Sequence, residues 1–173
     1  DDAGIAFAVY RIKDGAETKV NHQPLTSTTS VMDADPGEVY FLKAIVAGKE
    51  LSASAKVARR ATDYWEIPVQ LEEGYRLGDC SVGDLDGNGS YEIILHQTRD
   101  ARDNSFAGIT GSPILEAYQL DGKRLWRIDL GRNIREGEHY TQFIVYDLDG
   151  DGKAELACKT ADGTVDGAGK VIG

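Results

Sequence analysis

The chain has 173 residues, of which 41% are hydrophobic and 28% are charged, enough for one ordinary domain or two small ones. No apolar run approaches the roughly 20 residues of a spanning helix, so we expect no membrane partner. The formal net charge of −10 argues against a nucleic-acid partner, because no basic patch is present to bind phosphate.

The first 58 residues predict short β-strands and no helix. Strand-forming residues occur in four segments: 5–13, around 30–33, 39–47 and 50–57. Turn residues such as Asp14-Gly15 and Gly48 separate them. The spacing of these strands and turns resembles the later strands of a fibronectin type III-like sandwich, so we expect a partial sandwich over 1–58.

A polar stretch follows, and residues 59–73 are interpreted as a linker with a lead-in strand. The strand is expected from Trp65 to Leu71, where Pro68 implies an edge position. From residue 74 to residue 173 the chain is dominated by an internal repeat.

Two acidic loops define this repeat. Asp84-Leu-Asp-Gly-Asn-Gly-Ser-Tyr-Glu92 returns as Asp147-Leu-Asp-Gly-Asp-Gly-Lys-Ala-Glu155, which is 147 − 84 = 63 residues later. Oxygen-bearing side chains stand at loop positions one, three, five and nine, and glycines stand at four and six. Such a turn suits a hard cation, and we expect calcium.

The proposed ligands are the side chains at those four positions and the backbone carbonyl at position seven. They are Asp84, Asp86, Asn88, Ser90 and Glu92, and correspondingly Asp147, Asp149, Asp151, Lys153 and Glu155. An EF-hand is disfavoured, since its glutamate stands at position twelve between two helices. The alternative is an ordinary acidic turn with solvated carboxylates. Asn88 replaces an aspartate in the first loop, so we expect this loop to bind the cation more weakly than the second.

A hairpin lies between the two loops. The segments 114–120 and 123–130 predict strands, and Asp121-Gly122 is typical of a tight two-residue turn. With the strands around the first loop this gives about four strands per unit, as in the blades of a β-propeller. The fold class expected is therefore all-β, with one blade and the opening of a second.

The two cysteines, Cys80 and Cys158, match no zinc or redox motif. We expect buried reduced thiols, with a disulfide as the alternative. The chain begins with Asp1-Asp2 and stops at Gly173 within a strand-and-turn pattern, so a fragment is expected.

Several longer strings around these loops resemble the rhamnogalacturonan lyases of polysaccharide lyase family 11. They are Asp79-Cys-Ser-Val-Gly-Asp-Leu-Asp-Gly-Asn-Gly, Asp103-Asn-Ser, Tyr118-Gln-Leu-Asp-Gly-Lys-Arg-Leu-Trp-Arg-Ile-Asp-Leu-Gly-Arg-Asn-Ile, His139-Tyr-Thr-Gln-Phe, and the stretch from Tyr146 to Thr164. The resemblance implies a sandwich-like domain followed by a calcium-rich eight-bladed propeller. It also implies a secreted bacterial enzyme, which we expect to be a monomer acting on rhamnogalacturonan I by β-elimination.

The catalytic base is not identified by the sequence. His139, Tyr140 and Lys159 are candidates because they lie at strand ends, and the alternative is ordinary packing or solvation. Asp103 and Asn104 are expected to contact substrate, with a metal role as the alternative, since they lie in the long loop from Arg99 to Ser112. His96-Gln97 departs from the family at the position aligned with Lys159-Thr160.

Most of the propeller would lie outside these residues, so we expect the isolated chain to be inactive. Two rivals remain open at this point. One is a non-catalytic calcium-binding propeller for adhesion or carbohydrate binding, and the other is a pyrroloquinoline-type propeller dehydrogenase, which rests on Trp126.

Overall fold

A computed structural model describes residues 4–62, 64–102, 105–137 and 139–173. Every regular element in these ranges is a β-strand, which confirms the expected all-β class. Within the same ranges, no helix has the length and apolarity needed to cross a membrane. The chain divides into two compact units, Asp1–Trp65 and Glu66–Gly173, which are described separately.

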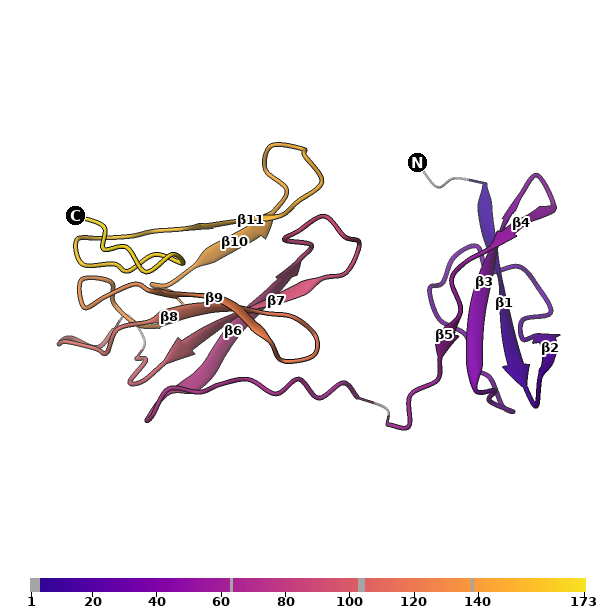
Figure 1. Ribbon diagram of the computed structural model, residues 1–173, viewed down its shortest axis with the longest axis horizontal. Helices are drawn as coiled ribbons and strands as arrows, with labels where there is room; N and C mark the ends of the chain where they lie inside the picture. The colour runs from indigo at the N-terminus through magenta and orange to yellow at the C-terminus, as the bar shows by residue number, and fades with distance from the viewer. Residues whose placement is uncertain (1–3, 63, 103–104, 138) are drawn as a thin grey trace. The chain divides into compact units, whose positions relative to one another are not determined.

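The first unit is one antiparallel sheet (Figure 1). Its strands are β1 (Ile5–Lys13), β2 (Ala16–Lys19), β3 (Val39–Val46), β4 (Lys49–Ala53) and β5 (Val57–Ala58). They are ordered β2-β1-β3-β4, with β5 also pairing with β3. The described strands form a single sheet, so the fibronectin type III-like sandwich stays a prediction.

The core of this unit is small. Ala6, Ala8 and Ile45 are buried together, with Tyr10 packed against them. The Tyr10 ring stacks on Phe41 with centroids 5.1 Å apart. The two rings meet because Tyr10 and Phe41 are direct cross-strand partners in the β1–β3 register.

The strand expected around residues 30–33 is wrong, because the structure has no strand there. Side chains hold this segment instead of a hydrogen-bonded ladder. Asp33 accepts a hydrogen bond from Arg11 Nη1 at 2.5 Å and another from the Tyr40 hydroxyl at 2.8 Å. β2, which the sequence did not predict, takes the place beside β1.

The second unit contains a four-stranded antiparallel sheet and a hairpin (Figure 1). The sheet runs in the order β6 (Arg76–Gly83), β7 (Glu92–Thr98), β8 (Ile114–Tyr118) and β9 (Arg124–Asp129), and the hairpin consists of β10 (Phe143–Tyr146) and β11 (Glu155–Cys158). The predicted hairpin joins β8 to β9, where Gln119 N donates to Lys123 O at 2.9 Å and Gly122 N donates to Gln119 O at 2.9 Å. The loop therefore has three residues, 120–122, and the expected two-residue turn is wrong. Gly122 has a φ of 88°, which favours glycine.

The hairpin shares a core with the sheet. Leu115, Leu130 and Ile134 form its buried centre, against which pack Trp126, Ile128, Phe143, Leu156, Cys158 and Ala161. Both cysteines are free: Cys158 is half-buried, and Cys80 is exposed, so the expected burial of Cys80 is wrong. Burial raises the pKa of the Cys158 thiol.

The lead-in strand expected from Trp65 to Leu71 is also wrong, because these residues have no strand pairing. The segment is held by side chains of the sheet. Gln97 Nε2 donates to Gln70 O at 2.9 Å, and Glu72 N donates to Gln97 Oε1 at 3.1 Å. Gln70 N also donates to the Tyr118 hydroxyl at 3.2 Å. Buried polar side chains thus replace a backbone ladder.

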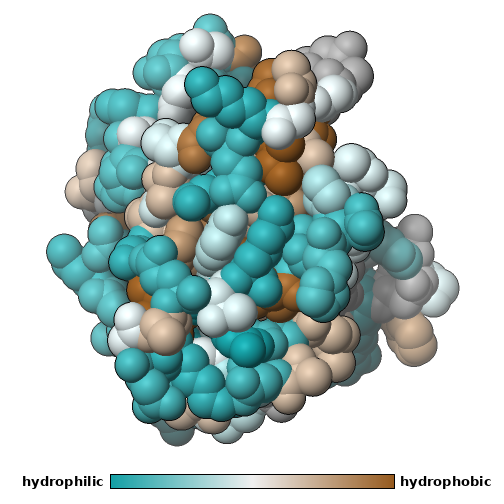
Figure 2. Space-filling view, turned by 90° about the vertical axis from the view of Figure 1, so that its right-hand side faces the viewer, coloured by the Kyte–Doolittle hydropathy of each residue, from teal (hydrophilic) through white to brown (hydrophobic). Residues whose placement is uncertain are grey.

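The surface is mainly hydrophilic on the face seen in Figure 2, where hydrophobic patches are small and separate. Single exposed apolar side chains such as Leu42 and Val57 are ordinary on a β-rich surface.

Candidate functional site

The two acidic loops fold in the same way. Asp84 accepts hydrogen bonds from the backbone amides of Gly87 at 2.7 Å, Asn88 at 3.1 Å and Gly89 at 2.7 Å. Asp147 makes the equivalent bonds with the amides of residues 150, 151 and 152 at 2.7, 3.1 and 2.9 Å. The first aspartate of each loop therefore organises the whole turn.

Glycine is required at position four of both loops, where φ is +76° at Gly87 and +78° at Gly150. The backbone amides then converge on the first aspartate. These hydrogen bonds lower the pKa of Asp84, although burial alone would raise it.

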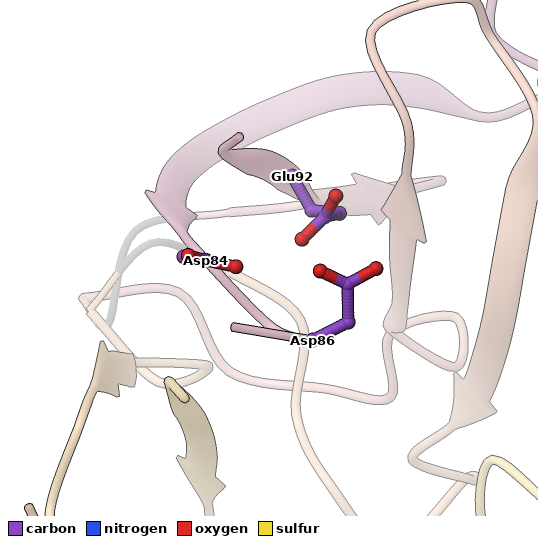
Figure 3. A group of neighbouring side chains, drawn as sticks. All are labelled: Asp84, Asp86 and Glu92. Carbon is purple, nitrogen blue, oxygen red and sulfur yellow. The ribbon is translucent and has the colours of Figure 1, made fainter. Parts of the chain in front are cut away.

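In the first loop, Asp84, Asp86 and Glu92 bring carboxylate oxygens within 4.8 Å of one another. Figure 3 shows the carboxylates of Asp86 and Glu92 facing a common space, with Asp84 beside it. Asn88 Nδ2 donates to Asp86 Oδ2 at 3.0 Å, so the side-chain amide of Asn88 lies beside this carboxylate group. The amide of Ser90 donates to Asn88 Oδ1 at 2.7 Å.

In the second loop, Asp147, Asp149 and Asp151 form the corresponding group within 4.8 Å. Glu155 lies outside that group. It accepts a hydrogen bond from Leu148 N at 2.9 Å, as Glu92 does from Leu85 N at 2.9 Å. The amide of Lys153 donates to Asp151 Oδ1 at 2.8 Å, as the amide of Ser90 does to Asn88 Oδ1 in the first loop.

The donor chemistry of both groups fits a hard divalent cation. Several carboxylates at this separation repel one another, and a cation bound by oxygen atoms would offset that repulsion. Neither group contains a thiol or imidazole, which would favour softer metals.

The two loops are in direct contact. Ala154 N donates to Asp84 O at 2.7 Å. Ala154 lies between the proposed ligands Lys153 and Glu155 of the second loop, and Asp84 is the first residue of the first loop. A Cβ on Gly87 would lie 3.3 Å from Lys153 Cγ. The repeat therefore places its two acidic loops against each other.

A second group of candidate residues lies at the ends of the β10–β11 hairpin, with His139 and Tyr140 before β10 and Lys159 after β11. Tyr140 is half-buried, with the Arg135 guanidinium 5.1 Å and Lys159 Nζ 5.9 Å from its ring centroid. The structure thus brings Tyr140 and Lys159 together. His139 is exposed and lines an open pocket with Thr141, Asp79 of β6 and Phe143 of β10.

Asp103 and Asn104 lie outside the described residues. The described flanks of their loop, 99–102 and 105–111, are held by Arg135 and Glu136. Sequence reasoning missed these two residues, because an Arg-Glu pair between strands is normally solvated.

Residues 64–173 match the family model described as rhamnogalacturonan lyase family 11, C-terminal domain. The chain belongs to rhamnogalacturonan lyase family 11. This confirms the family that the sequence strings indicated.

Two similar proteins come from Bacillus subtilis (strain 168). The rhamnogalacturonan endolyase YesW is 48% identical over 185 residues, and the rhamnogalacturonan exolyase YesX is 45% identical over 186 residues. Both alignments cover 100% of this chain. They cover 29% and 30% of the two relatives, so the chain spans under a third of their length.

Solved family 11 structures share the fold. The crystal structure of the exotype lyase YesX superposes with a TM-score of 0.83 at 45% identity, covering 100% of this chain and 30% of that one. The Bacillus licheniformis rhamnogalacturonan lyase gives a TM-score of 0.78 at 47% identity, covering 100% of this chain and 31% of that one.

Proposed function

We propose that this chain is part of a polysaccharide lyase that cleaves the rhamnosyl-(1→4)-galacturonosyl bond of rhamnogalacturonan I by β-elimination. The observation that carries the proposal is its membership of family 11, with 48% identity to a rhamnogalacturonan endolyase over its whole length. Because the chain spans under a third of that relative, the 173 residues alone are proposed to be inactive.

The reaction removes the proton at C5 of a galacturonate and breaks the bond between C4 and the departing oxygen, which leaves a C4=C5 double bond. The departing oxygen keeps the electron pair of the broken bond and takes up a proton to become a hydroxyl group. A base must take the proton, and positive charge must offset the charge that develops on the carboxylate. Tyr140 and Lys159 are the candidate base and cation, because they lie side by side. His139 is a second candidate for the base.

The two acidic loops are proposed to bind calcium. Asp84, Asp86, Asn88, Glu92 and the carbonyl of Ser90 would hold one ion, and the equivalent residues 147–155 would hold another. Bound calcium would supply charge neutralisation within each loop. This chain's own backbone amides orient the first aspartate of each loop, which supports the proposal.

The finer architecture proposed is a fibronectin type III-like first unit and calcium-stabilised propeller blades, secreted as a monomer. The four-stranded antiparallel sheet β6–β9 and the hairpin that follows support blades of this kind.

The test uses the complete natural polypeptide that contains this chain. Incubation with rhamnogalacturonan I is expected to raise the ultraviolet absorbance of the unsaturated uronate, and chelation of calcium is expected to reduce the rate. Calcium and polysaccharide binding without this product would favour a non-catalytic binding module and contradict the lyase proposal.

A further inference from the structure

Glu136 is fully buried, and its carboxylate joins both flanks of the loop between β7 and β8. Arg99 N donates to Oε1 at 2.6 Å, while Asp100 N and Gly111 N donate to Oε2 at 2.8 and 3.0 Å. A buried carboxylate needs such donors, since burial without them is costly. The first and last described turns of the loop are therefore held by one side chain.

The fit around Glu136 is close. A Cβ on Gly111 would lie 2.8 Å from Oε1 and 3.0 Å from Oε2 of Glu136. Any larger residue at 111 would have to push the carboxylate away from the amides that it binds. Glu136 N also donates to Thr110 Oγ1 at 3.0 Å.

Arg135 holds the same loop at a second place. Its Nη1 donates to Gly108 O at 2.5 Å, and its Nη2 donates to Phe106 O. Two adjacent residues thus fix three described segments of the loop: 99–100, 106–108 and 110–111. The side chains of Arg135 and Glu136 bind backbone groups of the loop, so they constrain the path of its main chain.

The same pair is tied to the candidate catalytic residues. The Arg135 guanidinium lies over the Tyr140 ring, and Lys159 lies near the same ring. Thr141 Oγ1 donates to Arg135 O at 2.9 Å. The loop and Tyr140 are therefore positioned by one short segment.

We propose that Arg135 and Glu136 are positioning residues that hold the described flanks of the 99–111 loop beside Tyr140 and Lys159, so that an acidic sugar chain binds there. The inference rests on the proposed lyase function for its substrate. The hold on the loop itself rests on the hydrogen bonds alone.

The test compares Glu136→Gln with Glu116→Gln in the complete natural polypeptide. Both glutamates are fully buried, but among the described residues the carboxylate of Glu116 hydrogen-bonds to Arg124, Gln97 and Tyr118, none of which lies in the loop. Glu136→Gln is expected to speed trypsin cleavage after Arg99 and Arg102 about tenfold below the melting temperature, because local opening becomes easier. Glu116→Gln is expected to lower the melting temperature without this cleavage.

The kinetic readout separates positioning from stability. Glu136→Gln is expected to raise KM for rhamnogalacturonan I about tenfold and to change kcat less. Gly111→Ala should reproduce both effects if Glu136→Gln does not fold. Equal loop cleavage in the two glutamate variants, or faster cleavage with KM unchanged, would overturn the proposal. If the wild-type protein has no lyase activity but Glu136→Gln is still cleaved faster than Glu116→Gln, the proposed function is contradicted, whereas the role of Glu136 in holding the loop is supported.

Discussion

Asn88 stands in the first loop where Asp151 stands in the second, and this difference has a measurable consequence. The amide of Asn88 donates to Asp86, whereas a carboxylate there would repel it. In Asn88→Asp, we expect a melting temperature below wild type in chelator and a larger rise on adding calcium, with affinity at this loop tighter by roughly tenfold.

Thermal melts and calorimetric titration, each with and without calcium, measure these two effects. The matched control is Asp151→Asn, which should make the second loop resemble the first and weaken its binding. Equal calcium-induced shifts in wild type and Asn88→Asp would contradict a ligand role for position 88.

Residue-scale burial is where sequence reasoning was weakest. The loop ligands were predictable because glycine and aspartate recur at fixed spacing in both copies. Glu136 and Glu116 were not, since an acidic residue in isolation is expected at the surface and both are fully buried. Their burial depends on amides and arginines from distant parts of the chain, which no local pattern reveals.

At the scale of elements, Asp33 connects β1 to β3 through Arg11 and Tyr40. Burial alone would raise the pKa of Asp33. Hydrogen bonds from Tyr40 and the Asp35 amide, together with Arg11, bring it below the ordinary 3.8. Stability from this carboxylate is therefore present above pH 3.8 and is lost as the pH falls through the lower folded value.

We expect Asp33→Asn to destabilise the protein by about 1–2 kcal/mol at neutral pH, because a charged acceptor is lost. The variant should also lose less stability than wild type between pH 5 and about 3, a window that brackets the ordinary pKa. Denaturant melts across this range measure both. If Asp33→Asn and wild type had the same pH dependence, Asp33 would not be the source of this pH-dependent part of the free energy of unfolding.

The elements that sequence predicted well were those bounded by turn residues. β1, β3, β8 and β9 all end near Asp-Gly or Gly turns, and their bounds agree within a few residues. The strands expected at 30–33 and 65–71 had β-like composition, but side chains of other strands hold these segments. Backbone pairing depends on a partner, which composition does not specify.

At the scale of the whole molecule, the two copies of the repeat meet at Gly83, the last residue of β6. A Cβ there would lie 2.6 Å from Val145 Cγ1 and 2.7 Å from Ala154 Cβ. Gly83→Ala is expected to cost about 2 kcal/mol, since overpacking forces the copies apart.

Gly167→Ala is the matched control, because its Cβ would meet Trp126 Cβ at an ordinary 3.5 Å. Chemical denaturation of both variants measures the difference. A Gly83→Ala protein as stable as Gly167→Ala would contradict the close contact between the copies.

The hydrogen bond from Ala154 N to Asp84 O gives the repeat a further property. If either acidic loop with its flanking strands were transplanted into another β-protein, it would carry only one partner of this hydrogen bond. The recipient would have to supply the missing hydrogen-bond partner, either a carbonyl for Ala154 N or an amide for Asp84 O. It would also need a glycine where the two copies approach most closely, as at Gly83. Because the two copies contact each other directly, we expect substitutions in one copy to be accompanied by compensating substitutions in the other.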